Sequence, residues 1–86
     1  MLWKVKVETR LKESILDPQG QAVESGLDSL GYKNVSDVHV GKYLELTVED
    51  IEKKEEVKEQ VDQMCQRLLA NPIIEDYSFQ VEKVEG

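Results

Sequence analysis

The stretch from Val35 to Glu49 limits the possible folds more than any other part of the chain. A two-residue hairpin at Gly41 and Lys42 would place Glu45 and Thr47 on its apolar face, because side chains alternate between the two faces of a strand. We therefore reject that hairpin. A continuous strand, bent or bulged at Gly41, is favoured, and a hairpin with an odd-numbered loop is the alternative. The apolar residues that keep one parity across the glycine are Val38, Val40, Leu44, Leu46 and Val48.

A continuous strand of this length would be too long for its own domain. About 15 residues at roughly 3.3 Å each span about 50 Å, whereas a compact domain of 86 residues is only about 30 Å across. The overhanging half would expose backbone groups together with Leu44 and Leu46 unless another chain covered them. The sequence therefore predicts a dimer that forms through this long strand.

The N-terminal third of the chain predicts one strand and one helix. Apolar and charged residues alternate from Trp3 to Leu11, which is the pattern of a half-buried strand. Asp17 and Pro18 have the character of an N-cap and a first helical residue, and Gly31 is placed to end that helix. The helix would present a single apolar stripe, formed by Val23, Leu27 and Leu30.

The C-terminal half predicts a second helix and a last strand. Asn71 and Pro72 should end the helix, and Tyr77, Phe79 and Val81 alternate with polar residues after it. The expected fold is a single α+β domain over residues 1–86, in the order strand, helix, long bent strand (or strand pair), helix, strand. Both helices should cover one face of an antiparallel sheet. The residues at helical spacing are Val57, Val61, Met64, Cys65 and Leu68.

Composition and charge exclude several classes of partner. The formal net charge of −7 repels a phosphate backbone, and no segment gathers lysine and arginine with aromatic residues, so we expect no nucleic-acid binding. The N-terminus alternates apolar and charged residues, and no apolar run approaches membrane length. We expect a cytoplasmic protein without a membrane partner.

No pattern in the sequence predicts chemistry by this chain. His39 is the only histidine, and it has no nucleophile or second ligand near it in sequence. Cys65 is the only cysteine and falls on the inward stripe of the second helix, where it is expected to be an inert core residue. The carboxylates lack metal-site spacing, and the glycines form no phosphate-binding loop. We predict no catalytic residue, no cofactor site and no metal site.

Three stretches together resemble the PurS family, the small subunit of phosphoribosylformylglycinamidine synthase. The resemblance covers essentially the whole chain and matches the expected order of elements. It implies a non-catalytic assembly subunit in the fourth step of de novo purine synthesis. The three stretches are Leu16 to Gly20, Val35 to Leu46 and Leu68 to Tyr77.

The resemblance also implies partners for the chain. Family members form dimers and bridge a glutaminase (PurQ) to a large ATP-dependent synthetase (PurL), and they are thought to assist the passage of ammonia. ATP and glutamine would be used by those partner subunits, which would leave no cofactor in this chain. A homodimer is expected, and dimers could pair further into a tetramer.

Candidate contact residues follow partly from the family motifs and partly from the overhanging strand. The family more often has arginine where this chain has His39, so a contact there would be weaker or pH-dependent. Lys42 and Tyr43 are the best candidates. The full set of expected dimer or partner contacts is His39, Gly41, Lys42, Tyr43, Leu44, Leu46, Asp17, Gln19 and Asn71.

Two other functions compete with assembly. A dimeric regulatory module that binds a small molecule is the alternative, because paired α+β domains often bind ligands at their interfaces. Gly41 is its only weak sequence signal. An independent enzyme ranks third, since no catalytic grouping supports it.

Overall fold

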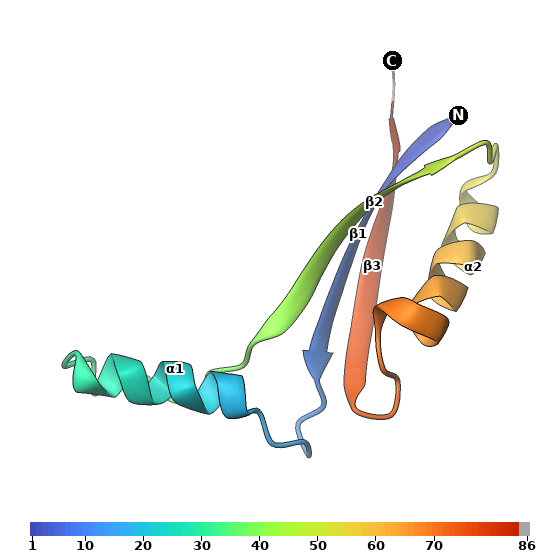
Figure 1. Cartoon of the computed structure of the whole chain (residues 1–86). Coiled ribbons are helices and arrows are strands. Elements are labelled where there is room, and N and C mark those ends of the chain that lie inside the picture. The colour runs from blue at the N-terminus through green and yellow to red at the C-terminus, as the bar shows by residue number, and fades with distance from the viewer. Residues whose placement is uncertain (85–86) are drawn as a thin grey trace.

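The computed structural model describes residues 1–84 and contains, within them, three strands, two α-helices and one π-helical turn (Figure 1). The helices and strands follow one another along the chain in the order expected from the sequence. The elements are β1 (Leu2–Leu11), α1 (Pro18–Ser29), β2 (Gly41–Glu49), α2 (Lys54–Met64), η1 (Cys65–Leu69) and β3 (Glu75–Val84).

The strands form one antiparallel sheet in the order β2-β1-β3. β1 lies at the centre, with Trp3 opposite Val48 on β2 and Thr9 opposite Tyr77 on β3. The alternation seen in the sequence of β1 is therefore confirmed, because its apolar residues face one side and its charged residues face the other. β2 and β3 are the two edges of the sheet.

The hydrophobic core lies between the apolar face of the sheet and α2. Val57 and Val61 of α2 are fully buried, as are Val5 and Val7 of β1. Trp3 closes one end of this core, where its indole Nε1 donates a hydrogen bond of 2.6 Å to the carbonyl oxygen of Ile51. The stripe that the sequence predicts for the second helix is confirmed for Val57, Val61 and Cys65, which are buried, and is wrong for Leu68, which is exposed.

The expected long strand is wrong for the single chain, and so is the strand pair. β2 begins only at Gly41, which is opposite Arg10, the residue before the end of β1. Residues 35–40 run past the end of β1, where the described chain offers no strand for them to pair with. The parity was interpreted correctly, since Val38 and Val40 are half-buried, but parity alone cannot supply a pairing strand.

The expectation that both helices cover one face of the sheet is also wrong for the single chain. α2 packs against the sheet, whereas α1 projects away from it past the β2 edge (Figure 1). α1 does begin and end where the sequence predicts, with Asp17 at its N-cap and Gly31 at a φ of 100° just beyond it. Only its burial differs from the expectation, because Gly20 is its one buried residue.

The projecting helix gives the protomer an open shape. The radius of gyration is 16.8 Å and the principal extents are 51 × 30 × 15 Å, compared with a radius of about 12 Å for a compact chain of this length. None of the described helices is long and apolar enough to cross a bilayer.

Candidate assembly surfaces

The buried carboxylate of Asp17 fixes the base of α1. Its two oxygens accept hydrogen bonds from the backbone N–H of Gly20 at 2.8 Å and of Val40 at 2.9 Å. These two bonds hold the pKa of Asp17 below its ordinary value, and the bond from Gly20 has the larger effect. One side chain thus caps α1 and ties it to the residue before β2, which sets the direction in which the helix projects.

His39 lies beside this junction. Its Nε2 is 3.0 Å from a carboxylate oxygen of Asp37, and its Nδ1 is 3.9 Å from Asp17. Asp37 has a φ of 61°, which marks a sharp turn of the backbone before β2. The structure therefore brings together the expected contact residues Asp17 and His39, although Asp17 is buried and holds the fold locally. Gln19, also expected to make contacts, is exposed in the first turn of α1.

A second carboxylate, Glu75 at the start of β3, holds the turn that follows η1. Its side chain accepts hydrogen bonds from the N–H of Asn71 at 2.7 Å and from the Thr9 hydroxyl at 3.3 Å. Lys42 lies 3.9 Å from it and donates a hydrogen bond of 3.1 Å to the carbonyl oxygen of Leu69. Lys42 and Asn71 are thereby brought together, and both already have partners within the chain. The sequence carries no sign of Glu75's contacts with Thr9 and Lys42, since these residues are far from it in the chain.

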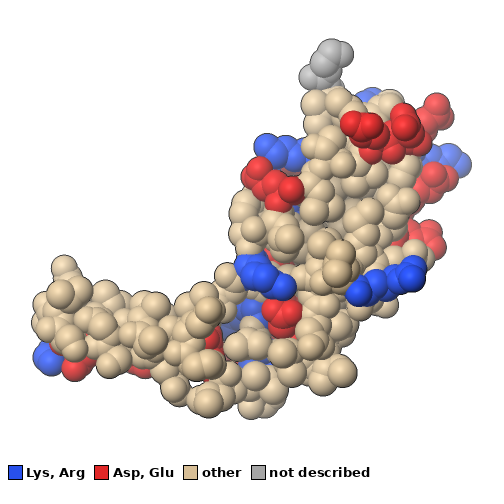
Figure 2. Space-filling model, in the orientation of Figure 1, with Lys and Arg blue, Asp and Glu red and all other residues tan. Residues whose placement is uncertain are grey.

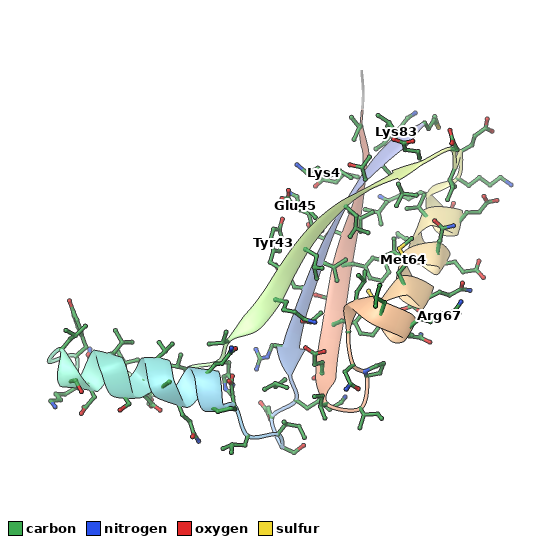
Figure 3. The ribbon with its side chains drawn as sticks, viewed as in Figure 1. Lys4, Tyr43, Glu45, Met64, Arg67 and Lys83 are labelled. Carbon is green, nitrogen blue, oxygen red and sulfur yellow. The ribbon has the colours of Figure 1, made fainter. Side chains whose placement is uncertain are left out.

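The polar face of the sheet, on the side away from α2, carries Tyr43 (Figure 3). Its ring is half-exposed, and its hydroxyl donates a hydrogen bond of 2.9 Å to Glu45. Partial burial of the hydroxyl raises the pKa of Tyr43 most, and the bond to Glu45 raises it further, so the phenol remains a donor at neutral pH. Tyr43 lines a hollow of ≈ 530 Å³ together with His39, Gly41 and Lys42. A small-molecule module would use this hollow, but its residues are largely exposed.

Leu44 and Leu46 point to the opposite face of β2 from Tyr43. Both are half-buried against the core under α2. The contact residues expected from the sequence therefore divide between the two faces of β2, and a single flat surface does not contain them all. A partner could reach Leu46 only from the side of the sheet where α2 lies.

Large apolar side chains remain exposed outside the region of β2. On α1, Val23 is 46% exposed, and Leu30, the C-cap residue just after the helix, is 75% exposed. In Figure 2 the projecting part of the molecule shows mostly uncharged atoms, while charged side chains gather over the sheet and α2. At the end of the second helix, Leu68 is 82% exposed. Large exposed apolar patches mark interaction sites, and these exposed side chains are spread over α1, the residues that follow it and the end of the second helix.

The one thiol in the chain is unsuited to nucleophilic chemistry. Cys65 is fully buried, and burial, with a contribution from the charge of Asp62, raises the pKa of its thiol. It lies at the start of η1, where the N–H of Ala70 donates to its carbonyl oxygen in the five-residue pattern of a π-helix. The interpretation of Cys65 as an inert core residue agrees with this geometry.

These features define a class: a small α+β chain with a projecting helix and an antiparallel sheet that has two edge strands. Residues 4–83 match the family model for PurS, phosphoribosylformylglycinamidine (FGAM) synthase. The chain is 52% identical to the PurS subunit from Bacillus subtilis over 83 residues, covering 96% of each chain. It is 42% identical to the subunit from Methanocaldococcus jannaschii, over 98% of this chain and 100% of that one.

Solved structures of this family have the same overall fold as this chain. The B. subtilis PurS structure matches with a TM-score of 0.83, over 94% of this chain and 99% of that one. A chain in the structure of PurLQS from Thermotoga maritima, 30% identical, matches with a TM-score of 0.85, over 95% of this chain and 99% of that one. The chain belongs to the PurS family of FGAM synthase subunits.

Proposed function

We propose that the chain is the non-catalytic assembly subunit of a cytoplasmic FGAM synthase, where it bridges a glutaminase (PurQ) and an ATP-dependent synthetase (PurL). The observation that carries this proposal is the match along nearly the full chain to a subunit of the T. maritima PurLQS structure. ATP and glutamine would be bound by the two partners. The chain itself would act by positioning them, so that ammonia passes between their active sites at high effective concentration.

The chemistry of the described residues supports a positioning role. His39 is engaged by Asp37 and Asp17, Cys65 is a buried thiol, and Lys42 is held by Leu69 and Glu75. Within residues 1–84, no group of three or more histidine, cysteine or carboxylate residues is placed to hold a metal ion. His39, Lys42 and Cys65 are thus engaged in contacts within the fold.

The functional form would be a homodimer that joins through the β2 edge, and two such dimers could form a tetramer. β2 is an edge strand, and residues 35–40, which precede it, have no pairing strand in the described chain. Such an edge, extended by an unpaired segment, favours the addition of a strand from another chain. The expected contact residues Gly41, Lys42, Tyr43, Leu44 and Leu46 all lie on β2.

Reconstitution of the synthase tests the bridging role. The synthetase and glutaminase are assayed for FGAM formation with and without this chain, using glutamine or free ammonium as the nitrogen source. We expect glutamine-dependent activity to fall by at least about tenfold when the chain is omitted, because ammonia must then diffuse between separate active sites. Ammonium-dependent activity should persist, since it bypasses the glutaminase.

Two results would contradict the proposal. One is glutamine-dependent activity that does not depend on the chain. The other is the absence of a ternary complex in size-exclusion chromatography with light scattering, measured with glutamine and nucleotide present. Turnover by the purified chain alone would instead support an independent enzyme. Thermal stabilisation of the isolated chain by a small molecule would favour the regulatory alternative.

A further inference from the structure

The second helix ends in a turn that is wider than an α-helical turn. In η1, at the lower end of that helix in Figure 1, the N–H of Ala70 donates a hydrogen bond of 2.9 Å to the carbonyl oxygen of Cys65. An α-helix would instead close that carbonyl with the N–H of Leu69. π-helical turns are rare and occur frequently at functional sites. η1 is therefore a candidate functional element of this chain.

The wider turn decides which of two neighbouring leucines packs against the core. Leu68 lies about three α-helical turns after Val57, so a continued α-helix would place it on the inward stripe. In the structure Leu68 is 82% exposed, whereas Leu69 is half-buried and packs against the core. The π-helical turn thus exchanges one leucine for the other at the inner position.

Apolar burial does not decide between the π-helical and the α-helical form of this turn, because the exchanged side chains are identical. A leucine packs inward and a leucine remains outside in either form. The carbonyl oxygen of Cys65 also has a backbone donor in either form, which is Ala70 in the π-helical turn and Leu69 in an α-helical one. The choice is then made by contacts at the end of the turn.

Lys42 on β2 makes the contact that favours the π-helical form. Its Nζ donates a hydrogen bond of 3.1 Å to the carbonyl oxygen of Leu69, one of the last carbonyls of the helix, which have no donor within it. The same Nζ is 3.9 Å from Glu75, whose carboxylate accepts a hydrogen bond of 2.7 Å from the N–H of Asn71. An α-helical turn would rotate the Leu69 carbonyl away from Lys42. One charged side chain therefore holds the turn in the observed form.

Lys42 is also accessible to other molecules. Its side chain is 56% exposed, and it lies on β2, an edge strand of the sheet. A carboxylate that binds at this edge competes with the Leu69 carbonyl for the ammonium group, because a charged acceptor binds it more strongly than a neutral one. One side chain thus connects the edge of the sheet to the end of the second helix.

We propose that η1 is a register switch held by Lys42. While Lys42 binds the Leu69 carbonyl, the turn stays π-helical, with Leu69 inward and Leu68 outward. When Lys42 is drawn away, the turn closes as an α-helix, Leu68 moves inward and Leu69 becomes exposed. A contact with Lys42 at the β2 edge thereby changes the surface at the end of the second helix.

Leucine methyl NMR on the chain alone tests the switch without altering either leucine. A soluble paramagnetic reagent broadens exposed methyl groups, and its effect is measured at Leu68 and Leu69. With Lys42 in place, we expect stronger broadening at Leu68, and in Lys42→Met we expect the order to reverse. Lys58→Met removes a cation from the exposed face of α2 and is the matched control, which should keep the original order. The test needs no partner subunit, so it is independent of the bridging role.

A pair of truncations gives a second measurement. While Lys42 is present, Leu69→Ala should lower the urea midpoint more than Leu68→Ala does, because Leu69 is the packed side chain. In a Lys42→Met background this order should reverse as well. Equal broadening of the two leucines in Lys42→Met would mean that the turn opens without changing its form, and it overturns the switch. An order that Lys42→Met leaves unchanged in either measurement also overturns it.

Discussion

The two helices of this chain are nearly equal in length and both are amphipathic, yet they differ in how much of their surface the chain buries. α2 fully buries Val57 and Val61 and continues into the buried Cys65. α1 buries only Gly20 and leaves Leu30 75% exposed. An apolar stripe thus shows that a helix needs cover, but it does not show which chain provides that cover.

The contrast follows from how each helix is joined to the sheet. α2 is connected to β2 by a short turn, and the Trp3 indole binds Ile51 within that turn, so the helix folds back over the core. α1 is tied at its base by Asp17, which directs it outward. One connection closes a core within the chain, and the other leaves a helix that projects from the sheet.

The largest effect is expected when an aspartate replaces an apolar residue of α2 in one variant and of α1 in a second variant. Val57→Asp buries a carboxylate with no partner, at a cost of several kcal/mol against a total stability of about 5–15 kcal/mol. We expect this variant to lose the cooperative unfolding transition of Trp3 fluorescence. Val23→Asp should keep that transition and lose only the dimer in light scattering. If Val23→Asp unfolds the core as severely, the protomer does not fold without cover for α1.

A smaller effect is expected at the base of α1. In Gly20→Ala, the new methyl group would overlap the carbonyl oxygen of Val38, and a backbone atom cannot rotate away as a side chain would. We expect a loss of about 1–3 kcal/mol in the free energy of unfolding, measured by urea denaturation. Ser25→Ala, on an exposed position of the same helix, is the matched control and should not lose stability. Equal effects in the two variants would mean that the junction yields to the added methyl.

Local parts of this architecture could be predicted from sequence, because their causes lie within a few residues. Asp17 and Pro18 start α1 and Gly31 ends it, as expected. The alternation in β1 and the stripe of α2 are likewise local patterns. By contrast, the start of β2 at Gly41 depends on where β1, some thirty residues earlier, runs out of pairing positions.

The candidate contact residues were harder to place for the same reason. Parity correctly puts Leu44 and Leu46 on one face, but only the packing of α2 shows that this face is partly used within the chain. Glu75 was missed because its partners Thr9 and Lys42 come from other strands. Tyr43, in contrast, is exposed on the polar face, where it remains a predicted contact.

The tether at the end of the second helix gives a third test. Glu75→Ala removes the acceptor for the Asn71 N–H and the Thr9 hydroxyl. We expect a loss of about 1 kcal/mol in the free energy of unfolding, because water can replace part of these bonds at a partly exposed site. Hydrogen exchange should quicken at Asn71 while α1 is unaffected. If exchange also quickens in α1, the two helix tethers are coupled.

The smallest effect is expected at the tether of α1, and it should depend on pH. The bonds from the Gly20 and Val40 amides, followed by the charge of His39, lower the pKa of Asp17 from 3.8. Because the folded-state pKa is depressed, the ionised carboxylate stabilises the fold above about pH 4, and this contribution is lost as the pH falls through the folded-state pKa. Asp17→Asn keeps the shape but accepts with one oxygen, so its melting temperature should be lower by about 3 °C at pH 7.

That difference in melting temperature should shrink as the pH falls from about 4, where the carboxyl of the unfolded chain takes up its proton, through the lower folded-state pKa, where the folded carboxyl also becomes neutral. His39→Gln is the matched variant, since it removes the imidazole beside Asp17 and leaves both amide bonds in place. If Asp17→Asn lowers the melting temperature equally at pH 7 and pH 3, the carboxylate charge does not hold this junction. The direction of α1 would then rest on the close packing of Gly20 against Val38.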